Sequence, residues 1–225
     1  MNHPRTILFD VNETLLDLGS LRPGFAALFG SAEPMGEWFA RTLHGSLVAN
    51  HTNRYRPFGL IGTEALVTLA QRRGANVSPD QAVELVAQMR RLPAHPDVPG
   101  ALERLRATGH RLVTLTNGST DTVSDQLTNA GIAHLFERSI SVDAIRQFKP
   151  APAVYLHATA MLGVDVDRAL MVAAHDWDII GARSVGMPGA YLARPGTVWG
   201  MPDDPPELVT GDVAQLADRL IGEQR

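Results

Sequence analysis

Short apolar runs alternate with amphipathic segments along most of the chain. The runs are brief and rich in branched side chains, which is typical of strands buried on both faces. They predict strands at Thr6–Phe9, Arg111–Leu115, Arg138–Ser141, Ala169–Val172 and Gly189–Leu192. The segments between and after them predict helices at Ala101–Ala107, Thr122–Ala130, Pro152–Leu162, Ile179–Val185 and Val213–Ile221. Alternating strands and helices predict an α/β fold with a doubly wound parallel sheet.

Residues 18–95 interrupt this alternation. Apolar residues recur there at three- and four-residue spacing, without a convincing strand. They form two stripes, Leu60, Ala65, Leu66, Leu69, Ala70 and Ala82, Val83, Leu85, Val86, Met89. We predict a helical cap that is inserted after the first strand, has Trp38 and Phe39 in its own core, and rejoins through the proline-rich hinge Pro93–Gly100. Residues 1–17 and 96–225 then form the core domain, and residues 18–95 form the cap.

Composition narrows the classes of function. The 225 residues carry a net charge of −4, so nothing favours binding to nucleic acid or to an anionic membrane. The absence of cysteine excludes disulfides and thiolate nucleophiles. The chain shows neither a signal-type apolar region nor an apolar run approaching membrane-spanning length. We therefore expect a cytoplasmic protein that binds neither nucleic acid nor membrane.

Asp10 is the first candidate for chemistry, because it directly follows the first predicted strand. The carboxyl ends of parallel strands form the edge at which α/β sheets bind their ligands. Thr14 follows four residues later, and Asn12 lies between the two. An amide cannot shuttle a proton near neutral pH. The segment therefore offers a carboxylate nucleophile but no second carboxyl group for acid/base work.

Two later segments add polar groups at the same edge of the predicted sheet. Thr116, Asn117 and Gly118 follow the second strand and precede a helix, where hydroxyl, amide and backbone N–H groups can bind an anion. Lys149 precedes Pro150 and another helix. Its ammonium can compensate a carboxylate nucleophile that attacks beside a second, substrate carboxylate.

A fourth segment, His175-Asp176-Trp177-Asp178, follows the fourth predicted strand. It is preceded by Ala173-Ala174, which offer no ligand for a metal. An octahedral Mg²⁺ site made from Asp10, a backbone carbonyl and Asp178 alone would be poor. We therefore expect neither a metal nor another cofactor.

These segments, in this order, resemble the motifs of the haloacid dehalogenase superfamily. The phosphatases of that superfamily carry Asp at the position of Asn12 and Gly-Asp at the position of Ala173-Ala174. Two independent departures thus remove the groups on which phosphatase chemistry depends. The whole chain, cap included, is similar to the L-2-haloacid dehalogenases (type II), a resemblance that implies a Rossmann-like core closed by a helical cap.

The resemblance also implies roles for individual residues. It implies that Asp10 is the nucleophile and that Thr14, Lys149 and Asp178 complete the catalytic group, with Tyr155 in support. It further implies halide binding by Arg41, Phe58 and Trp177, and binding of the substrate carboxylate by Val11, Asn12, Thr116, Asn117 and Gly118.

One departure concerns the hydrolytic water. The best-known dehalogenases carry Ser-Ser-Asn where this chain has Ala173-Ala174-His175. We interpret His175 as the group that orients or deprotonates the water, together with Asp178, because an imidazole suits proton abstraction near neutral pH. A structural histidine bonded to the backbone is the alternative.

The predicted reaction is hydrolytic dehalogenation of short (S)-2-haloalkanoic acids to 2-hydroxy acids. Asp10 displaces halide from C2, and water then hydrolyses the resulting aspartyl ester. The partners are a haloacid substrate and the halide product, and the resemblance implies a homodimer. Two alternatives remain open at this point: a phosphatase of the same superfamily with an altered Mg²⁺ site, and a non-catalytic binding protein on this scaffold.

Overall fold

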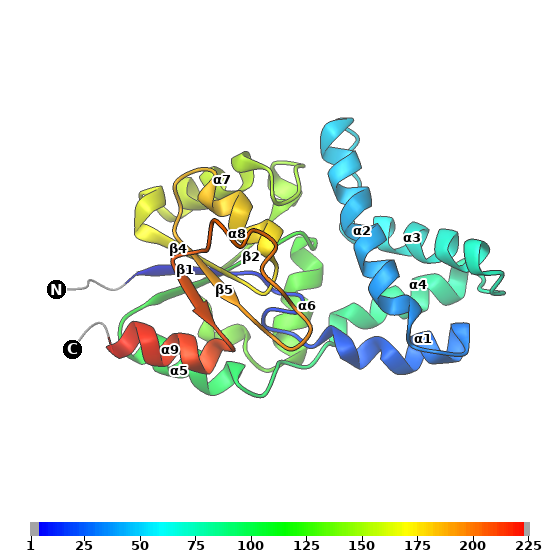
Figure 1. Cartoon of the computed structure of the whole chain (residues 1–225), viewed down its shortest axis with the longest axis horizontal. Helices are drawn as coiled ribbons and strands as arrows, with labels where there is room; N and C mark the ends of the chain where they lie inside the picture. The colour runs from blue at the N-terminus through cyan, green and yellow to red at the C-terminus, as the bar shows by residue number, and fades with distance from the viewer. Residues whose placement is uncertain (1–4, 223–225) are drawn as a thin grey trace.

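A parallel sheet lies between two layers of helices in the computed structural model, which describes residues 5–222 (Figure 1). Over these residues the sheet has six strands in the order β3-β2-β1-β4-β5-β6, and all neighbours are parallel. The strands are β1 (Thr6–Phe9), β2 (Arg111–Thr116), β3 (Arg138–Ser141), β4 (Ala169–Ala173), β5 (Gly189–Leu192) and β6 (Leu208–Thr210). The predicted doubly wound parallel sheet is confirmed.

The strand predictions differ from the structure in two respects. Strands β2 and β4 each extend one residue further than predicted, to Thr116 and Ala173. The sequence prediction missed β6 altogether. This strand has three residues at the edge of the sheet and exposes Val209. A short edge strand needs no continuous apolar run, so the pattern had nothing to detect.

Helices cover both faces of the sheet. They are α5 (Val98–Ala107), α6 (Thr120–Asn129), α7 (Pro152–Leu162), α8 (Asp176–Arg183) and α9 (Val213–Gly222), with short 3₁₀ turns η3 (Ala133–Leu135), η4 (Val142–Ala144) and η5 (Val166–Arg168). Helices α7 and α8 pack together on one face, and α5 packs against α9 on the other (Figure 1). Within residues 5–222, no helix combines the length and the apolar character needed to cross a membrane.

Two helix boundaries correct the sequence prediction. Helix α5 begins at Val98, so the end of the predicted hinge is helical, and Pro99 lies in the first turn, where a missing N–H costs nothing. Helix α8 begins at Asp176, one turn earlier than predicted. Its first turn therefore contains both Asp176 and Asp178, where carboxylates interact favourably with the helix dipole.

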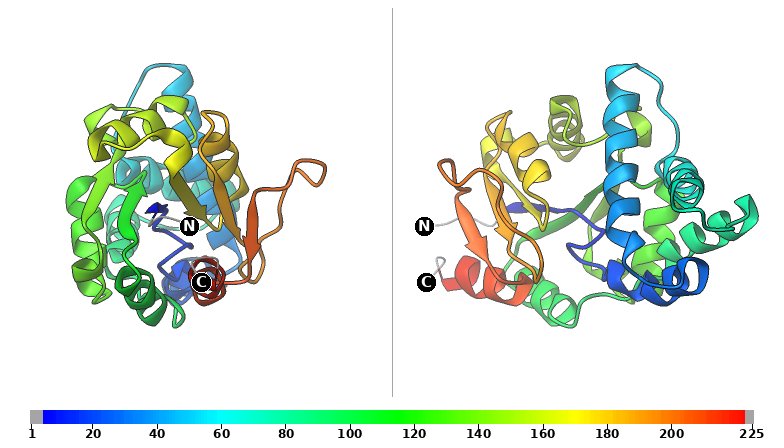
Figure 2. Two further views of the ribbon diagram at one scale, coloured as in Figure 1. Left: turned by 90° about the vertical axis from the view of Figure 1, so that its left-hand side faces the viewer. Right: turned by 45° about the vertical axis from the view of Figure 1, so that its right-hand side comes forward.

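The regular elements between β1 and α5 are all α-helices or short 3₁₀ helices. They are η1 (Leu18–Leu21), α1 (Arg22–Phe29), α2 (Pro34–His51), α3 (Phe58–Arg73), α4 (Pro79–Ala87) and η2 (Gln88–Arg91). These helices lie beyond the end toward which β1 runs, with α2 on the side that faces the core (Figures 1 and 2). Trp38 of α2 is buried and donates to the carbonyl of Gly62 in α3 (2.8 Å). The boundaries of this cap at residues 18 and 95 remain predictions.

The chain enters and leaves the cap through two segments that lie side by side. Leu16 and Ala94 form an antiparallel bridge. The N–H of Asp17 donates to the carbonyl of Pro93 (2.8 Å), and the N–H of His95 donates to the carbonyl of Leu15 (2.9 Å). The crossing lies only a few residues after Asp10, so the cap is anchored beside the carboxyl end of β1.

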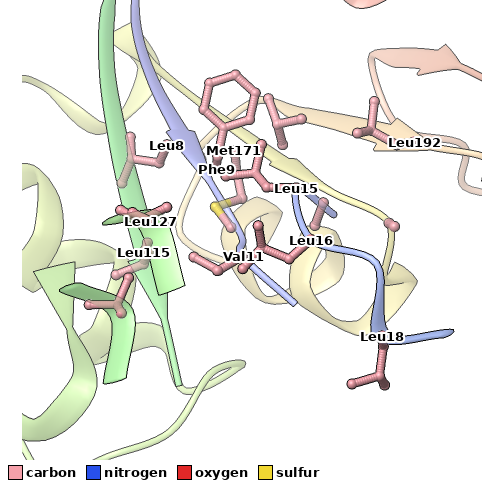
Figure 3. Packing of buried hydrophobic residues seen from close by; sticks show 14 of the residues in the cluster. Leu8, Phe9, Val11, Leu15, Leu16, Leu18, Leu115, Leu127, Met171 and Leu192 are labelled. Atoms are coloured by element: carbon pink, nitrogen blue, oxygen red, sulfur yellow. The ribbon is translucent and has the colours of Figure 1, made fainter. Parts of the chain in front are cut away.

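Buried apolar side chains on both sides of Asp10 in the sequence fix its position. Leu8, Phe9, Val11 and Leu15 are fully buried, and Figure 3 shows them gathered between β2 and β4 with Met171. Burying each large aliphatic side chain stabilises the fold by about 1.5–3 kcal/mol. The N–H of Asp10 also donates to Val172 in β4 (2.9 Å), which continues the ladder one residue beyond β1.

Gly181 of α8 lies where a larger side chain would not fit, so a substitution there tests the close packing of α8 beside the site. A Cβ at Gly181 would lie 2.5 Å from the Tyr155 hydroxyl and 2.9 Å from the carbonyl oxygen of Pro150. We expect Gly181→Ala to lower the free energy of unfolding by about 1–3 kcal/mol through overpacking, measured by urea denaturation. At Gly100 of α5, a Cβ meets nothing within 4 Å. Gly100→Ala should stabilise by about 0.5–1 kcal/mol, and equal effects of the two substitutions would contradict the close packing.

Candidate active site

Three neighbouring strands bring the predicted polar segments together. Strand β1 lies between β2 and β4, so the residues that follow these strands share one edge of the sheet. Asp10 follows β1, Asn117 follows β2, and His175 lies two residues beyond the end of β4. Lys149 reaches the same edge from the segment before α7. Residues that are far apart in the sequence therefore form one site.

The ammonium of Lys149 lies between two carboxylates. Its Nζ donates to Asp10 Oδ1 (2.8 Å), to Asp178 Oδ2 (2.6 Å) and to the carbonyl oxygen of Leu115 (2.8 Å). An ammonium has three donors, and all three are used. The Lys149 side chain exposes no surface. Lys149 is also the only lysine in the chain.

Asp178 is held from its other side by Tyr155. The Tyr155 hydroxyl donates to Asp178 Oδ1 (2.7 Å), while Asp178 Oδ2 accepts from Lys149. The side chain of Asp178 is completely buried. Burial, followed by the charge on Asp178, raises the pKa of Tyr155 far above its ordinary value, so this residue stays a donor. Asp178 and Tyr155 thus fix the Lys149 ammonium beside Asp10.

Charge sharing sets the ionisation of this group. Burial by itself raises the pKa of Asp10, but Lys149 and His175, with hydrogen bonds from Lys149 and Thr14, bring it below its ordinary value. Burial by itself lowers the pKa of Lys149, and the charges on Asp10 and Asp178 raise it above its ordinary value. Burial raises the pKa of Asp178 against the opposing effect of Lys149. Asp10 is therefore the carboxylate that stays ionised most readily.

Thr14 orients the second oxygen of Asp10. Its hydroxyl donates to Asp10 Oδ2 (2.7 Å) and accepts from the N–H of Ala174 (2.9 Å). The carbonyl of Thr14 accepts from Arg194 Nη2 (2.7 Å), and Arg194 also pairs with Asp97 (3.0 Å). Both oxygens of Asp10 consequently have fixed donors, which holds the carboxylate plane in one orientation.

Asn117 presents a free donor near Lys149. Its Oδ1 accepts from the backbone N–H of Lys149 (2.8 Å), and its Nδ2 is buried without a hydrogen-bond partner in the structure. Thr116 Oγ1 accepts from the N–H of Gly118 (3.0 Å), which shapes the turn after β2. An unpaired buried donor is unfavourable unless a ligand satisfies it. Asn117 is therefore suited to bind an anionic oxygen.

Val11 and Asn12, predicted for the same anion, lie in the turn after Asp10. The carbonyl of Val11 accepts from the N–H groups of Leu15 and Leu16 (2.9 and 3.0 Å). The side-chain oxygen of Asn12 accepts from Gln126 Nε2 (2.9 Å). This amide is thus committed to the core and cannot stand in for an acid/base group.

His175 lies at the more open side of Asp10. Its Nε2 is 4.0 Å from Asp10 Oδ2 and 3.4 Å from Glu13 Oε2. The ring stacks on Trp177 (centroids 5.1 Å apart) and contacts Phe39 of the cap (5.9 Å). These two aromatic contacts restrict the orientation of the imidazole. A separation of 4.0 Å is too long for a direct hydrogen bond and is suited to a bridging water.

The residues predicted to bind halide come from three helices, α2, α3 and α8. Trp177 lies beside the site, with its ring 5.9 Å from Lys149 Nζ. Phe58 is buried at the start of α3 and contacts Phe148 (6.0 Å). Arg41 of α2 donates twice to Glu37, one turn earlier in the same helix (2.9 and 2.7 Å). Its role in halide binding remains a prediction.

Sequence reasoning missed three residues of this region. Phe39, assigned to the cap core, also contacts His175. Asn50 of α2 exchanges two hydrogen bonds with the backbone of Phe148 (2.8 and 2.9 Å), which ties the cap to the segment that carries Lys149. Glu13 reaches His175 from the turn after Asp10. Only Glu13 had a local signal, because it is a charged residue inside the Asp10–Thr14 motif.

The side chains do not suit a divalent cation. Among residues 5–222, no group of three or more His, Asp or Glu side chains is arranged to hold a metal ion. The position between Asp10 and Asp178 is taken by the Lys149 ammonium. We therefore derive no chemical step through Mg²⁺.

Comparison with known proteins supplies a context for this geometry. The sequence-family model of the haloacid dehalogenase-like hydrolases matches residues 4–186 of this chain. (S)-2-haloacid dehalogenase H-109 of Pseudomonas putida is 28% identical over 217 residues, covering 96% of this chain and 97% of that enzyme. Haloacetate dehalogenase H-2 of Moraxella sp. (strain B) is 30% identical over 198 residues, covering 87% and 88%.

A solved structure matches over nearly the full length. L-2-haloacid dehalogenase from Xanthobacter autotrophicus, with chloropropionic acid covalently bound, superposes with a TM-score of 0.88 at 25% identity. The match covers 99% of this chain and 100% of that one.

Removing the central cation tests the electrostatics of the site. Lys149→Met leaves two buried carboxylates without a compensating cation, and we expect it to lower the free energy of unfolding at neutral pH by about 3–5 kcal/mol. The loss should shrink as the pH falls through the carboxyl range, because protonation removes the buried charges. Urea denaturation at several pH values measures both effects.

Arg56→Met is the matched control, since it breaks only the exposed pair with Glu64 and should change stability little at any pH. A loss for Lys149→Met that does not depend on pH would contradict the electrostatic explanation.

Proposed function

The chain belongs to the haloacid dehalogenase-like hydrolase family, and from this premise we propose that it hydrolyses short (S)-2-haloalkanoic acids to 2-hydroxy acids. The observation that carries the proposal is the Asp10 carboxylate. It is buried, held in one orientation by Thr14 and Lys149, and kept ionised. Such a group is a nucleophile that needs neither a metal nor a neighbouring base to become reactive.

In the first step, Asp10 attacks C2 of the haloacid and halide leaves from the opposite side. A carbon–oxygen bond forms to Asp10 as the carbon–halogen bond breaks, so the configuration at C2 inverts. Asn117 Nδ2, with the Thr116 hydroxyl and the backbone N–H groups of Val11 and Asn12, binds the substrate carboxylate. Gly118, predicted for the same role, orients the Thr116 hydroxyl through its N–H. Lys149 compensates the negative charge of two carboxylates that meet in a buried site. The covalent chloropropionic acid complex of the Xanthobacter relative supports an ester intermediate.

Arg41, Phe58 and Trp177 receive the halide in this proposal. A cation beside an apolar wall stabilises an anion that develops away from water. To reach the halide, Arg41 releases its ion pair with Glu37. Glu37 then keeps its second ion pair, with Arg73 (2.8 Å). The pair with Glu37 is about one-third exposed, so releasing it costs little.

In the second step, water attacks the carbonyl carbon of the Asp10 ester. We propose that His175 takes the proton from this water, because its Nε2 lies 4.0 Å from Asp10 Oδ2, a separation that one water can bridge. The Lys149 ammonium stabilises the oxyanion that forms at Oδ1. The bond between the acyl carbon of Asp10 and the C2 oxygen then breaks, and that oxygen takes up the second proton of the water. The products are the Asp10 carboxylate and the 2-hydroxy acid, with one proton left on His175.

The two alternatives from the sequence are weaker. A phosphatase needs an acid/base group at position 12, whereas Asn12 is an amide bonded to Gln126. A non-catalytic binding protein would have no need for a buried ammonium between two carboxylates, since such an arrangement is often less stabilising than apolar packing. The relatives reported above carry dehalogenase names.

A homodimer and a cytoplasmic location are further expectations. Size-exclusion chromatography with light scattering would show whether the particle has the mass of one chain or of two.

Isotope incorporation tests the nucleophile. In single turnover of (S)-2-chloropropionate in H₂¹⁸O with excess protein, we expect one ¹⁸O atom in the peptide that contains Asp10 and none in the first product. Asp10→Asn should release no chloride. Chelators should have no effect. Chloride release with ¹⁸O in the 2-hydroxy acid alone would mean that water attacks C2 directly, which contradicts the proposal.

Halide binding is tested on the cap. Arg41→Ala should slow the chloride burst about 100-fold, the order expected for loss of one preorganised donor to a developing anion. Glu37→Gln removes the same surface ion pair but leaves the guanidinium, so its burst should remain near the wild-type rate. Stopped-flow detection of chloride measures both. Equal slowing in the two variants would assign Arg41 a structural role.

A further inference from the structure

Glu13 adopts a backbone conformation that its residue type disfavours. Its φ is +62°, in the left-handed region where glycine is the ordinary choice. The turn itself is held by backbone groups. The N–H of Glu13 donates to Leu16 (2.8 Å), and the carbonyl of Glu13 contacts His95 Nε2 (3.1 Å). The side chain of Glu13 is thus not needed to form the turn, although a strained residue at such a site commonly serves function.

The carboxylate of Glu13 faces the imidazole of His175. Glu13 Oε2 is 3.4 Å from His175 Nε2, the same nitrogen that lies 4.0 Å from Asp10 Oδ2. Within residues 5–222, this is the one ion-pair contact recorded for the Glu13 side chain. The nitrogen of His175 therefore stands between the nucleophile and a second carboxylate.

Glu13 also connects His175 with solvent. Its side chain is 36% exposed, compared with 12% for His175. It lines a cavity of about 440 Å³ whose wall includes Asp17, Arg22, His95 and Arg194. A proton on Glu13 can therefore leave to water, whereas His175, enclosed by aromatic rings, has little direct contact with solvent.

The charges around Glu13 favour a proton acceptor that releases its proton again. Burial, and then the charges on Asp10 and Asp17, raise the pKa of Glu13, while His175 opposes them. Arg22, His95 and Arg194 face the same cavity from the cap, the hinge and the core. Asp178 is not an alternative acceptor on this route, because its buried carboxylate is already bonded to Lys149 and Tyr155.

Resting on the proposed dehalogenation, we infer that Glu13 relays the proton of the hydrolytic water from His175 to solvent. Hydrolysis of a haloacid releases one proton together with the halide. As the water oxygen bonds to the Asp10 carbonyl carbon, its O–H bond breaks and the proton goes to His175 Nε2. Before the tetrahedral intermediate collapses, the Nε2–H bond breaks as the proton passes to Glu13 Oε2, which prevents its return to the water oxygen. From Glu13 the proton leaves to water in the cavity. Glu13 touches no reacting atom, so it is a positioning residue that acts through His175.

The two chemical steps separate this role from the proposed function. The chloride burst reports attack by Asp10, and the decay of the ester, followed by quenching and peptide mass spectrometry, reports hydrolysis. We expect Glu13→Gln to leave the burst within twofold of wild type and to slow ester decay at least tenfold, so that the ester accumulates. Glu64→Gln, on the cap surface beside Arg56, is the matched control and should change neither step.

Glu13→Gly is a second variant, included in case Glu13→Gln folds poorly. Glycine adopts the positive φ of this position without strain. This variant should show the same slow ester decay, and added formate should accelerate that decay in proportion to its concentration, which a merely structural role would not produce.

Ester decay at the wild-type rate in Glu13→Gln would overturn the relay. Equal slowing of the burst and the decay, without rescue by formate, would also overturn it and leave Glu13 a structural role. Absence of any chloride burst in wild type would instead remove the proposed function, and the relay with it.

Discussion

One buried ammonium organises this protein. Lys149 Nζ spends its three donors on Asp10, Asp178 and the carbonyl of Leu115. Two carboxylates this close would repel each other, and one would take up a proton, without a cation between them. With Lys149 present, the pKa of Asp10 falls below its ordinary value despite burial. The reactivity proposed for Asp10 depends on this single interaction, which also explains why the position between the carboxylates suits no metal.

The rest of the architecture keeps that ammonium in place. Asn117 binds the backbone of Lys149, Tyr155 holds Asp178, and Gly181 lets α8 approach Tyr155 closely. Asn50 of the cap bonds the backbone of Phe148, next to Lys149. Cap and core therefore meet at the segment that carries the charge, so docking of the cap and electrostatics of the site are coupled. Glu13 and His175 complete the opposite, more open side of Asp10.

The sequence predicted most of the sheet, because buried parallel strands leave continuous apolar runs, as at Thr6–Phe9 and Gly189–Leu192. It could not predict β6, because none of the three residues of this strand is buried. The motifs also predicted the segments that meet at Asp10, since three of them follow a strand and the Lys149 segment precedes a helix. Contacts between the cap and the core could not be predicted from the sequence. Phe39, for example, contacts His175, but its spacing in a helix is that of an ordinary core residue. For Arg41 the sequence pattern did not predict the observed pair with Glu37, and its role in halide binding remains a prediction.

The most direct measurement follows the charge of Lys149 itself. Because this is the only lysine in the chain, protein labelled with ¹⁵N-lysine gives a single Nζ resonance. Titrated from neutral to alkaline pH, this resonance should keep the shift of an ammonium beyond the ordinary lysine pKa of about 10.4, because Asp10 and Asp178 raise the pKa of Lys149. Asp10→Asn should move the midpoint downward. A wild-type midpoint at or below the ordinary value, unchanged in Asp10→Asn, would contradict the claim that Lys149 keeps Asp10 ionised.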